Sequence, residues 1–318
     1  MHESDIFRIF VRFLIMRTIR YSILFLFLSL FLHTAGATKR ALVIGIGAYP
    51  SETGWASISG ANDVPVVRQM LIDNGFEARN IQTLIDAQAT YNGIKLAFHH
   101  LIATSQTGDD VYIQFCGHGQ QITDVSGDEA DAYGLDEAWV PYDAYLAYQK
   151  GVYEGQHHLI DDELNVYLSQ LRRHIGPDGH ILVIADACHT AGSTRGDDDE
   201  EEWEELIEQY PYLQTEVHRG GDDFIIPQGE SGAVHATREP VAEDWLLISA
   251  CDSHQANYEY NGLGSLTYVM TTLPKPLAEY TGQELYYAVV NRMRSIRPRQ
   301  NPKIDGPADR KSKPILSD

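Results

Sequence analysis

The chain has 318 residues, of which 43% are hydrophobic and 22% are charged, so it has enough apolar material for one large core or two small ones. Lysine and arginine number 24 against 45 aspartates and glutamates, which gives a formal net charge of −21. A surface this acidic repels phosphate backbones, so we expect no nucleic-acid partner. Three cysteines without a Cys-x-x-Cys pair exclude both a disulfide framework and a structural zinc site.

The N-terminus has the pattern of a signal peptide. An apolar run at 21–32 follows two arginines and precedes Ala-Gly-Ala at 35–37. The run is shorter than the roughly 20 residues that a membrane helix needs, so it predicts no stable membrane anchor. We therefore expect residues 1–37 to be removed, with Met16 as the preferred initiator, and the mature chain to be periplasmic or secreted.

From residue 40 onward, short apolar runs alternate with helical patterns. This alternation is typical of strands joined by crossover helices, so it predicts an α/β fold with a mostly parallel sheet. The helix that opens at Asn62-Asp63-Val64-Pro65 is expected to begin with a capping side chain and an early proline. Strands are predicted at 41–46, 81–85, 111–115, 181–185 and 245–250, and helices at 62–74, 90–103, 161–173 and from a capping box at Thr281-x-x-Glu284 onward.

Two long segments, 117–155 and 196–243, interrupt the alternation. Their length predicts loops that lie outside the core and carry function or flexibility. Each begins just after the carboxyl end of a predicted strand, and open α/β sheets place their binding sites at that end.

Two of the predicted strands lead directly into reactive side chains. One runs into Cys116-Gly117-His118-Gly119, and the other into Asp186-Ala187-Cys188-His189. A thiol becomes a nucleophile when an imidazole accepts its proton, so a cysteine and a histidine at matching strand ends are the minimum arrangement for acyl transfer. The backbone N–H groups of Gly119 and Cys188 are candidates for an oxyanion hole. From the residues alone, a buried free cysteine beside a core histidine remains the alternative.

These motifs resemble the caspase-like cysteine peptidases, and within them the metacaspases and their bacterial relatives. The resemblance implies a three-layer sandwich with about six mostly parallel strands and helices on both faces. It also implies that His118 is the general base and acid and Cys188 the nucleophile. It divides the chain into a larger half at 38–195, an acidic linker at 196–243 and a smaller half at 244–318. The motifs that carry it are Arg40-Ala41-Leu42-Val43-Ile44-Gly45-Ile46, Gly60-Ala61-Asn62-Asp63-Val64, Gly117-His118-Gly119, Leu135-Asp136-Glu137-Ala138, Val140-Pro141-Tyr142-Asp143, Asp161-Asp162-Glu163-Leu164, Asp186-Ala187-Cys188-His189, Ser249-Ala250-Cys251 and Gly264-Ser265-Leu266-Thr267.

The resemblance extends to the substrate. Metacaspase-like enzymes cut proteins or peptides after Arg or Lys with acidic residues that match Asp63 and Asp186 here. Two carboxylates in a partly desolvated pocket favour a cationic side chain and repel an anionic one. For Asp63, helix capping is the alternative. Cys116 stands where the family usually has a serine, so the wall of the pocket is altered.

Some metacaspases bind calcium through loop aspartates. Asp161 and Asp162 match two such positions, and Asp131 in the acidic loop after His118 is a further candidate, so the resemblance makes calcium a possible ligand; no organic cofactor is required. The histidine pairs at 99–100 and 157–158 are interpreted as surface pairs, because neither has the i, i+4 spacing of a helical metal site.

Three arginines are potential cleavage points: Arg195 directly before the linker, and Arg219 and Arg238 within it. Acidic residues next to an arginine would be repelled by a carboxylate-lined pocket, so Arg219, beside Gly220-Gly221, is predicted to be the best site of self-processing. Two other function classes compete. One is an inactive caspase-fold scaffold, which the presence of His118 and Cys188 disfavours. The other is a nucleotide-binding protein, which the missing third glycine after Gly45-x-Gly47 disfavours.

Overall fold

The computed structural model describes residues 37–127, 135–187, 217–235, 244–252, 255–297 and 300–317. The predicted leader up to residue 36, Asp131 and Cys188 lie outside these ranges. Within them, no helix is both long enough and apolar enough to cross a bilayer.

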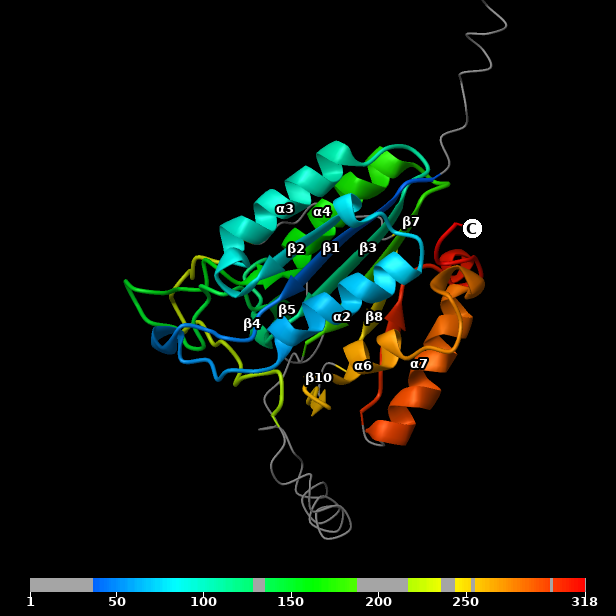
Figure 1. The fold of residues 1–318 in the computed structure, drawn as a ribbon. Coiled ribbons are helices and arrows are strands. Elements are labelled where there is room, and N and C mark those ends of the chain that lie inside the picture. Colours follow the sequence, from blue (N-terminus) through cyan, green and yellow to red (C-terminus); the bar gives the residue numbers. More distant parts are fainter. Residues whose placement is uncertain are drawn as a thin grey trace, which may run out of the picture. The chain divides into compact units, whose positions relative to one another are not determined.

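A six-stranded sheet forms the centre of the domain (Figure 1), with strand order β11-β8-β7-β3-β1-β2. All neighbours are parallel except β11, which is antiparallel to β8 at the edge. The inner strands are buried on both faces, which explains their nearly continuous apolar runs. The strands are β1 (Lys39–Gly45), β2 (Ile81–Ile85), β3 (Asp110–Cys116), β7 (His180–Asp186), β8 (Leu246–Ser249) and β11 (Lys303–Asp305).

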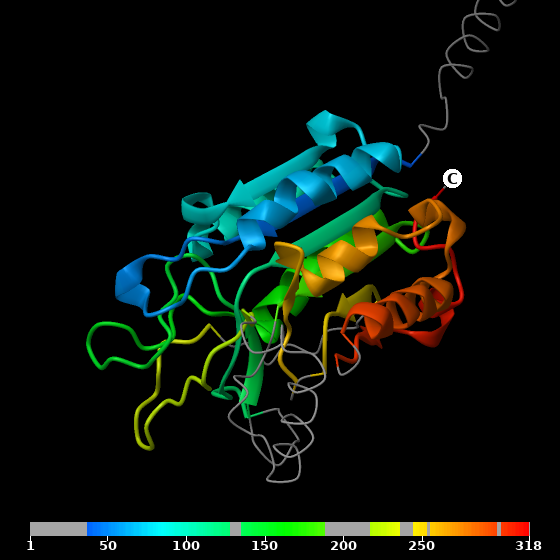
Figure 2. The ribbon, with the colours of Figure 1, turned by 60° about the horizontal axis from the view of Figure 1, so that its bottom comes forward.

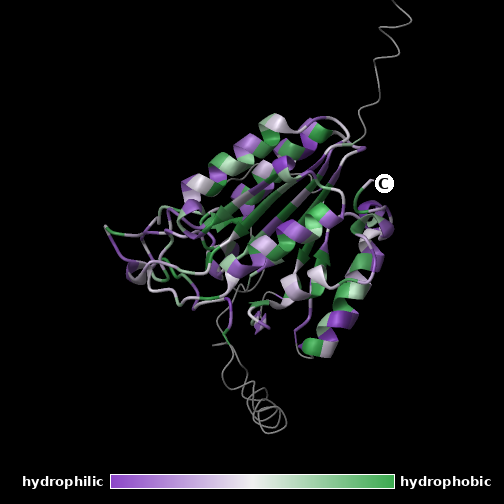
Figure 3. Cartoon of the chain, viewed as in Figure 1, coloured by the Kyte–Doolittle hydropathy of each residue, from purple (hydrophilic) through white to green (hydrophobic). Residues whose placement is uncertain are grey.

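Helices cover both faces of this sheet (Figure 1). Alternate residues of β1 divide between two hydrophobic cores: Leu42 and Ile44 pack with α3 and α4, whereas Ala41 and Val43 pack with α2, α6 and α7. Figure 3 shows the strands as the most apolar layer. The predicted three-layer α/β fold is therefore confirmed. The helices are α2 (Gly60–Asp73), α3 (Tyr91–Thr104), α4 (Asp161–Ile175), α6 (Ser265–Thr271) and α7 (Gly282–Ile296).

Several of the shorter elements lie at the carboxyl end of the central strands (Figure 2), whereas the helix Ala308–Lys311 and the turns Ala78–Asn80 and Leu277–Glu279 lie at the amino end. The segment 117–155, predicted as a loop, contains two strands of a small antiparallel sheet with order β4-β5-β6, so the loop prediction was wrong there. These strands have few apolar residues, so the sequence contains no apolar run that would predict them. The elements are β4 (Gly119–Thr123), β5 (Leu135–Trp139), β6 (Leu159–Ile160), the hairpin β9 (Glu259–Tyr260) and β10 (Leu263–Gly264), the short helix α8 (Ala308–Lys311), and single 3₁₀ turns at Ser51–Thr53, Ala78–Asn80, Asp86–Gln88 and Leu277–Glu279.

Two helix starts test the capping predictions. At α7 the capping box is confirmed, because the Glu284 N–H donates to Thr281 Oγ1 at 3.3 Å and the Thr281 N–H donates to Glu284 Oε2 at 2.9 Å. At α2 the cap prediction was wrong: the helix begins at Gly60, and its N-cap residue Ser59 makes no side-chain cap hydrogen bond. The Asp63 carboxylate is thereby left for another role.

Candidate active site

The sheet register places the two reactive segments at one edge. Cys116, the last residue of β3, is paired with Asp186, the last residue of β7. His118 and Cys188 each follow two residues behind this pair, so the chain leaves both strands at the same level. The register thus supports the predicted proximity of the dyad, although Cys188 itself lies outside the described residues.

His118 is held as a neutral base. Its side chain is 1% exposed, and its Nε2–H donates to the Ala56 carbonyl at 2.9 Å. Nδ1 therefore carries the lone pair, and it is buried without a hydrogen-bond partner among the described residues. Burial lowers the pKa of His118 to about 4, and the nearby Arg219 charge acts in the same direction. The imidazole is therefore neutral at physiological pH, with Nδ1 as its unprotonated nitrogen.

Two aromatic residues fix the orientation of the imidazole. Trp55 stacks on it with a centroid distance of 4.6 Å, and Tyr49 packs against it at 5.1 Å. The Tyr49 hydroxyl accepts the His118 N–H at 3.0 Å and donates to the Val140 carbonyl at 3.0 Å. The ring is thus constrained by two neighbouring aromatic side chains and through its own backbone.

Gly119 and the linker residue Arg219 meet beside this histidine. The Gly119 N–H, the predicted oxyanion-hole donor, points to the Arg219 carbonyl oxygen at 3.5 Å. This distance is long for a hydrogen bond. It nevertheless places a peptide carbonyl in front of the group that is predicted to bind one.

The Arg219 side chain fills the predicted substrate pocket. It is fully buried, and its Nη2 lies 2.7 Å from Asp63 Oδ2. Its Nη1 donates to the Asp186 carbonyl at 3.1 Å and lies 3.7 Å from Asp186 Oδ2. Nη2 also donates to Ser59 Oγ at 3.1 Å, and Nε donates to Glu259 Oε1 at 3.3 Å. Asp63 and Asp186 therefore do form an acidic pocket, and a guanidinium already occupies it.

Burial governs the electrostatics of this pocket. It raises the pKa of Asp63 to about 6, although the Arg219 charge opposes this shift. The surrounding carboxylates raise the pKa of Arg219 despite its own burial, so the guanidinium stays charged. An uncompensated carboxylate buried here would be costly, so the Arg219 guanidinium stabilises the buried Asp63 and Asp186.

Asp186 is oriented by residues from the C-terminal half. Its Oδ1 accepts from Asn257 Nδ2 at 2.8 Å, and its Oδ2 accepts from the Thr267 N–H at 2.6 Å. Each carboxylate oxygen of Asp186 thus accepts a hydrogen bond that fixes the orientation of the side chain. Asp186 shapes the pocket, whereas Asp63 makes the shorter contact with the guanidinium.

Cys116 lies next to these orienting residues. Its Sγ accepts from Gln114 Nε2 at 3.3 Å and lies 3.6 Å from Thr267 Oγ1. Burial, with help from Asp63, raises the pKa of this thiol well above its usual value. Cys116 is therefore a neutral, unreactive group in the wall behind the pocket.

The segment around Arg219 is built into the fold. Phe224 is fully buried, as Arg219 is, so the prediction that the linker lies outside the core was wrong for this part. The carboxylates that hold Arg219 come from distant parts of the chain. The length of the linker therefore could not indicate that this part of it is buried. Arg195 and Arg238 lie outside the described residues.

The predicted calcium ligands lie only partly within the described residues. The described residues contain no group of three or more histidine, cysteine, aspartate or glutamate side chains that could hold a metal. Asp161 and Asp162 are the first two residues of α4, and Asp131 is not described. No step of the reaction below uses a metal.

Of the two histidine pairs predicted to lie on the surface, only one does so in full. His99 and His100 are exposed, as expected of a surface pair. His158 is fully buried, so interpreting 157–158 as a surface pair was wrong. Its ring bridges the Tyr153 hydroxyl at 2.9 Å and Gln120 Oε1 at 2.7 Å. This is a satisfied core histidine rather than a catalytic one.

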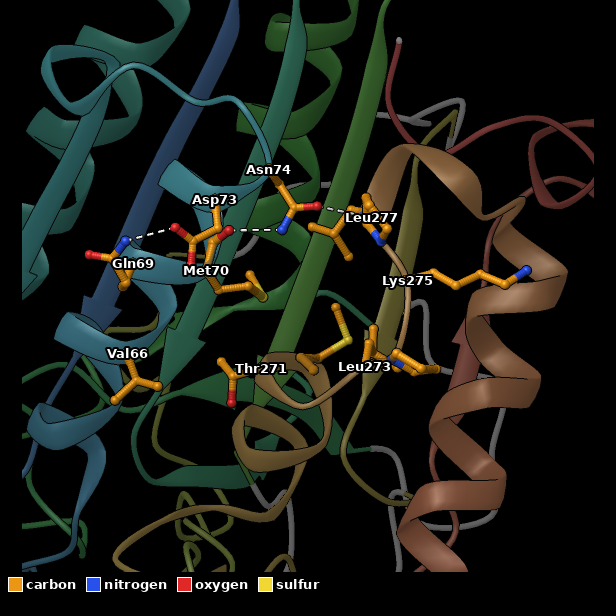
Figure 4. Close-up of a pocket in the computed structure, with 12 residues that line it drawn as sticks. Val66, Gln69, Met70, Asp73, Asn74, Thr271, Leu273, Lys275 and Leu277 are labelled. Carbon is orange, nitrogen blue, oxygen red and sulfur yellow. Dashed lines mark hydrogen bonds between the residues drawn. The ribbon is translucent and has the colours of Figure 1, made fainter.

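A separate cavity of about 430 Å³ lies between α2 and the segment that follows α6 (Figure 4). Its lining contains no histidine or cysteine. Polar groups of the lining form hydrogen bonds with one another. Asp73 Oδ1 accepts from Gln69 Nε2 at 2.8 Å, and Asn74 Oδ1 accepts from the Leu277 N–H at 2.6 Å. The chemistry therefore concentrates at the His118 edge of the sheet.

Comparison with known protein families matches a caspase domain to residues 38–313. The chain belongs to the caspase-domain family. This confirms the family predicted from the motifs, and the histidine and acidic pocket of this domain lie at the edge of the sheet where the motifs placed them.

Relatives of this caspase domain include metacaspases. Metacaspase-7 of Arabidopsis thaliana is 32% identical over 162 residues, which cover 48% of this chain and 35% of the relative. Metacaspase-1 of Eremothecium gossypii is 29% identical over 163 residues, which cover 49% and 32%. The match thus spans about a third of the length of these relatives.

One solved structure has the same fold. Protein GSU0716 from Geobacter sulfurreducens superposes with a TM-score of 0.59 and is 20% identical. The superposition covers 88% of this chain and 99% of that chain, so it extends over nearly the whole caspase domain.

The motifs did not reveal two residues of the pocket, Ser59 and Glu259. Glu259 accepts from the Ser59 N–H at 2.5 Å and from Ser59 Oγ at 2.6 Å, so it closes the pocket across 200 residues of sequence. Ser59 directly precedes the Gly60-Ala61-Asn62-Asp63 turn, which was a usable signal. Glu259 is one acidic residue among 45 and has no motif around it.

Proposed function

We propose that this caspase-domain protein is a cysteine endopeptidase that cuts after Arg or Lys, with Cys188 as nucleophile and His118 as base and acid. The occupied pocket is the observation that carries the proposal. A buried arginine side chain sits between Asp63 and Asp186 while its carbonyl faces the Gly119 N–H, which is how a substrate would enter.

The proposed reaction follows the order of cysteine-peptidase chemistry. Nδ1 of His118 takes the proton of the Cys188 thiol, and the thiolate attacks the carbonyl carbon after the basic residue. The Gly119 N–H stabilises the oxyanion, and His118 then protonates the leaving amine. A water molecule hydrolyses the thioester. Acceptors at Nε, Nη1 and Nη2 match the planar fork of a guanidinium, so we infer that Arg is preferred over Lys.

We propose that the first substrate is the chain's own Arg219–Gly220 bond. Because Arg219 blocks the pocket, the intact chain should be nearly inactive towards other peptides. Exchange of Arg219 for glutamine should give a chain that hydrolyses Arg peptides at once and is not cut at this position. The parent chain should instead accumulate fragments that end at Arg219.

Purified parent, Arg219→Gln and Cys188→Ala chains, incubated with and without calcium, test this by intact mass and peptide hydrolysis. The Cys188→Ala chain is the control for cleavage by a contaminant. An Arg219→Gln chain without peptidase activity would favour the inactive-scaffold alternative. Fragments of the Cys188→Ala chain ending at Arg219 would refute self-processing. We propose that calcium promotes this reaction, and equal cleavage rates with and without calcium would contradict that.

We also propose that the protein is exported. The Thr38 N–H, next to the expected cleavage site, donates to Asp109 Oδ1 at 3.1 Å where β1 begins, so folded structure starts directly after the predicted leader. The exported protein is expected to begin at Thr38. N-terminal sequencing of the extracytoplasmic fraction checks this, and a protein that is found only in the cytoplasm with its leader would contradict it.

A further inference from the structure

The bond between Arg219 and Gly220 is anchored on both sides by different partners. Before it, the Arg219 N–H donates to the Asn257 carbonyl at 2.8 Å, and the Glu259 N–H donates to the Val217 carbonyl at 3.2 Å. This half is a short strand antiparallel to the one that begins β9. In a peptidase it represents the acyl side of a substrate.

The leaving-group side, residues 220–226, is an extended segment that runs alongside β4 and is joined to it by two isolated parallel bridges. The Phe224 N–H donates to the Gln121 carbonyl at 2.8 Å, and the Thr123 N–H donates to the Phe224 carbonyl at 3.0 Å. Parallel bridges join Gly119 to Gly220 and Ile122 to Phe224, so this segment has one residue more than β4 between them. At this bulge, Gln120 Nε2 donates to the Asp222 carbonyl at 2.5 Å.

The Phe224 side chain locks this segment in place. It is fully buried, and its ring packs on His158 at a centroid distance of 4.7 Å and on Tyr153 at 5.8 Å. His158 is itself fixed between Tyr153 and Gln120. We call this group of side chains around the Phe224 ring the Phe224 seat. Burial lowers the pKa of His158 to about 3, so the seat stays neutral at physiological pH. The same glutamine thus holds both the bulge and the seat of Phe224.

Gly221 provides another close contact on this side. A Cβ atom there would lie 2.5 Å from Leu146 Cδ1 and 2.6 Å from Trp55 Cζ3. Trp55 is the ring that stacks on His118. The backbone just beyond the scissile bond is therefore packed against the group that orients the base.

This arrangement affects what happens after the bond breaks. A leaving group normally diffuses away, and water then hydrolyses the thioester. Here Phe224 would keep the new Gly220 amine beside the thioester. An amine held in this way reacts with an effective concentration of about 10⁵ M or more, so it should compete strongly with water.

We propose that the Phe224 seat makes self-cleavage reversible: the Gly220 amine re-forms the Arg219–Gly220 peptide bond, so that the segment acts as a slowly cut inhibitor. This inference rests on the proposed function. In the forward step the thiol proton passes through His118 to the Gly220 nitrogen as the C–N bond breaks and the C–S bond forms. In the reverse step the amine attacks the thioester, the C–S bond breaks, and the amine proton returns through His118 to the sulfur. No other reactant is needed. Phe224 is a positioning residue in this scheme.

Phe224→Leu keeps an apolar side chain but loses the ring contacts, and Phe98→Leu is the matched change. Phe98 is equally buried but stacks on Tyr167 in the α3 and α4 layer. The experiment follows intact and cut chain by mass over time for parent, Phe224→Leu and Phe98→Leu. It then incubates each purified cut chain and measures how much intact chain returns. Thermal unfolding reports on stability in all three.

The cut form should accumulate about tenfold faster in Phe224→Leu than in the parent or Phe98→Leu, because water then wins over the displaced amine. In a purified cut chain the Cys188 thiol must first displace water from the Arg219 carboxyl group, which re-forms the thioester, and the Gly220 amine then attacks it. By this route cut parent and Phe98→Leu chains should regain intact chain, and Phe224→Leu should regain much less. A loss of stability alone does not produce this return of a peptide bond. Equal rates in all three chains, or no return of intact parent, would overturn the inference. If Arg219→Gln hydrolyses no Arg peptide, the proposed function has failed instead.

Discussion

Substitution of Cys188 by alanine, or of His118 by glutamine, is expected to abolish peptide hydrolysis, with a loss of about four to six orders of magnitude in kcat. The thiol has no other acceptor in the proposed scheme than Nδ1 of His118, whose Nε2–H is engaged by Ala56. The measurement is kcat/KM for an Arg peptide in the Arg219→Gln background, where the pocket is open. Thermal unfolding of each variant should show that the fold is retained.

Cys251→Ala is the matched control for the nucleophile. Cys251 is another buried thiol, and its Sγ donates to the Gln255 carbonyl at 3.1 Å, away from His118. Its removal should leave the rate within about a factor of three, whereas an active-site-directed thiol reagent should label only chains that retain Cys188. Activity close to that of the Arg219→Gln chain in either dyad variant would show that the dyad assignment is wrong.

The sequence was sufficient for the central sheet because its strands are buried on both faces. Residues 41–46 and 181–185 are apolar throughout, and 111–115 is apolar except for Gln114. The observed strands β1, β3 and β7 differ from these ranges by one or two residues at each end. Since parallel strands end at one edge, the same runs also predicted where His118 would lie. This prediction needed only local pattern and register.

Other parts depend on contacts that no local pattern records. β5 reads Leu-Asp-Glu-Ala-Trp, and it is a strand because it pairs with β4 and β6. Arg219 lies in an acidic, glycine-containing stretch that resembles a solvated loop. It is buried because carboxylates from α2, β7 and β9 surround it, and their positions are set by the tertiary fold.

The pocket carboxylates give the second large effect, and Asp63→Asn should impair cleavage after Arg most. Asp63 Oδ2 lies 2.7 Å from the guanidinium in a fully buried site, whereas Asp186 Oδ2 lies 3.7 Å away. Loss of such a buried charge contact should cost on the order of 2–4 kcal/mol in transition-state binding, which corresponds to about 30- to 900-fold in kcat/KM. The measurement compares Arg, Lys, Asp and leucine peptides in the Arg219→Gln background.

The pH dependence separates this charge effect from a loss of shape. The pKa of Asp63 is about 6 with a guanidinium bound. Without the guanidinium its lowering effect is lost, whereas the neighbouring Asp186 charge still raises this pKa. Below that pH the carboxyl becomes neutral, so kcat/KM for Arg peptides should fall as the pH drops through about 6 or slightly above, well before His118 titrates near 4. In Asp63→Asn this acidic limb should disappear. Asp109→Asn, which removes a buried carboxylate paired with Arg40 at 2.6 Å, should retain it. Efficient cleavage after Asp or a large apolar residue, or an unchanged limb in Asp63→Asn, would show that these carboxylates do not select the substrate.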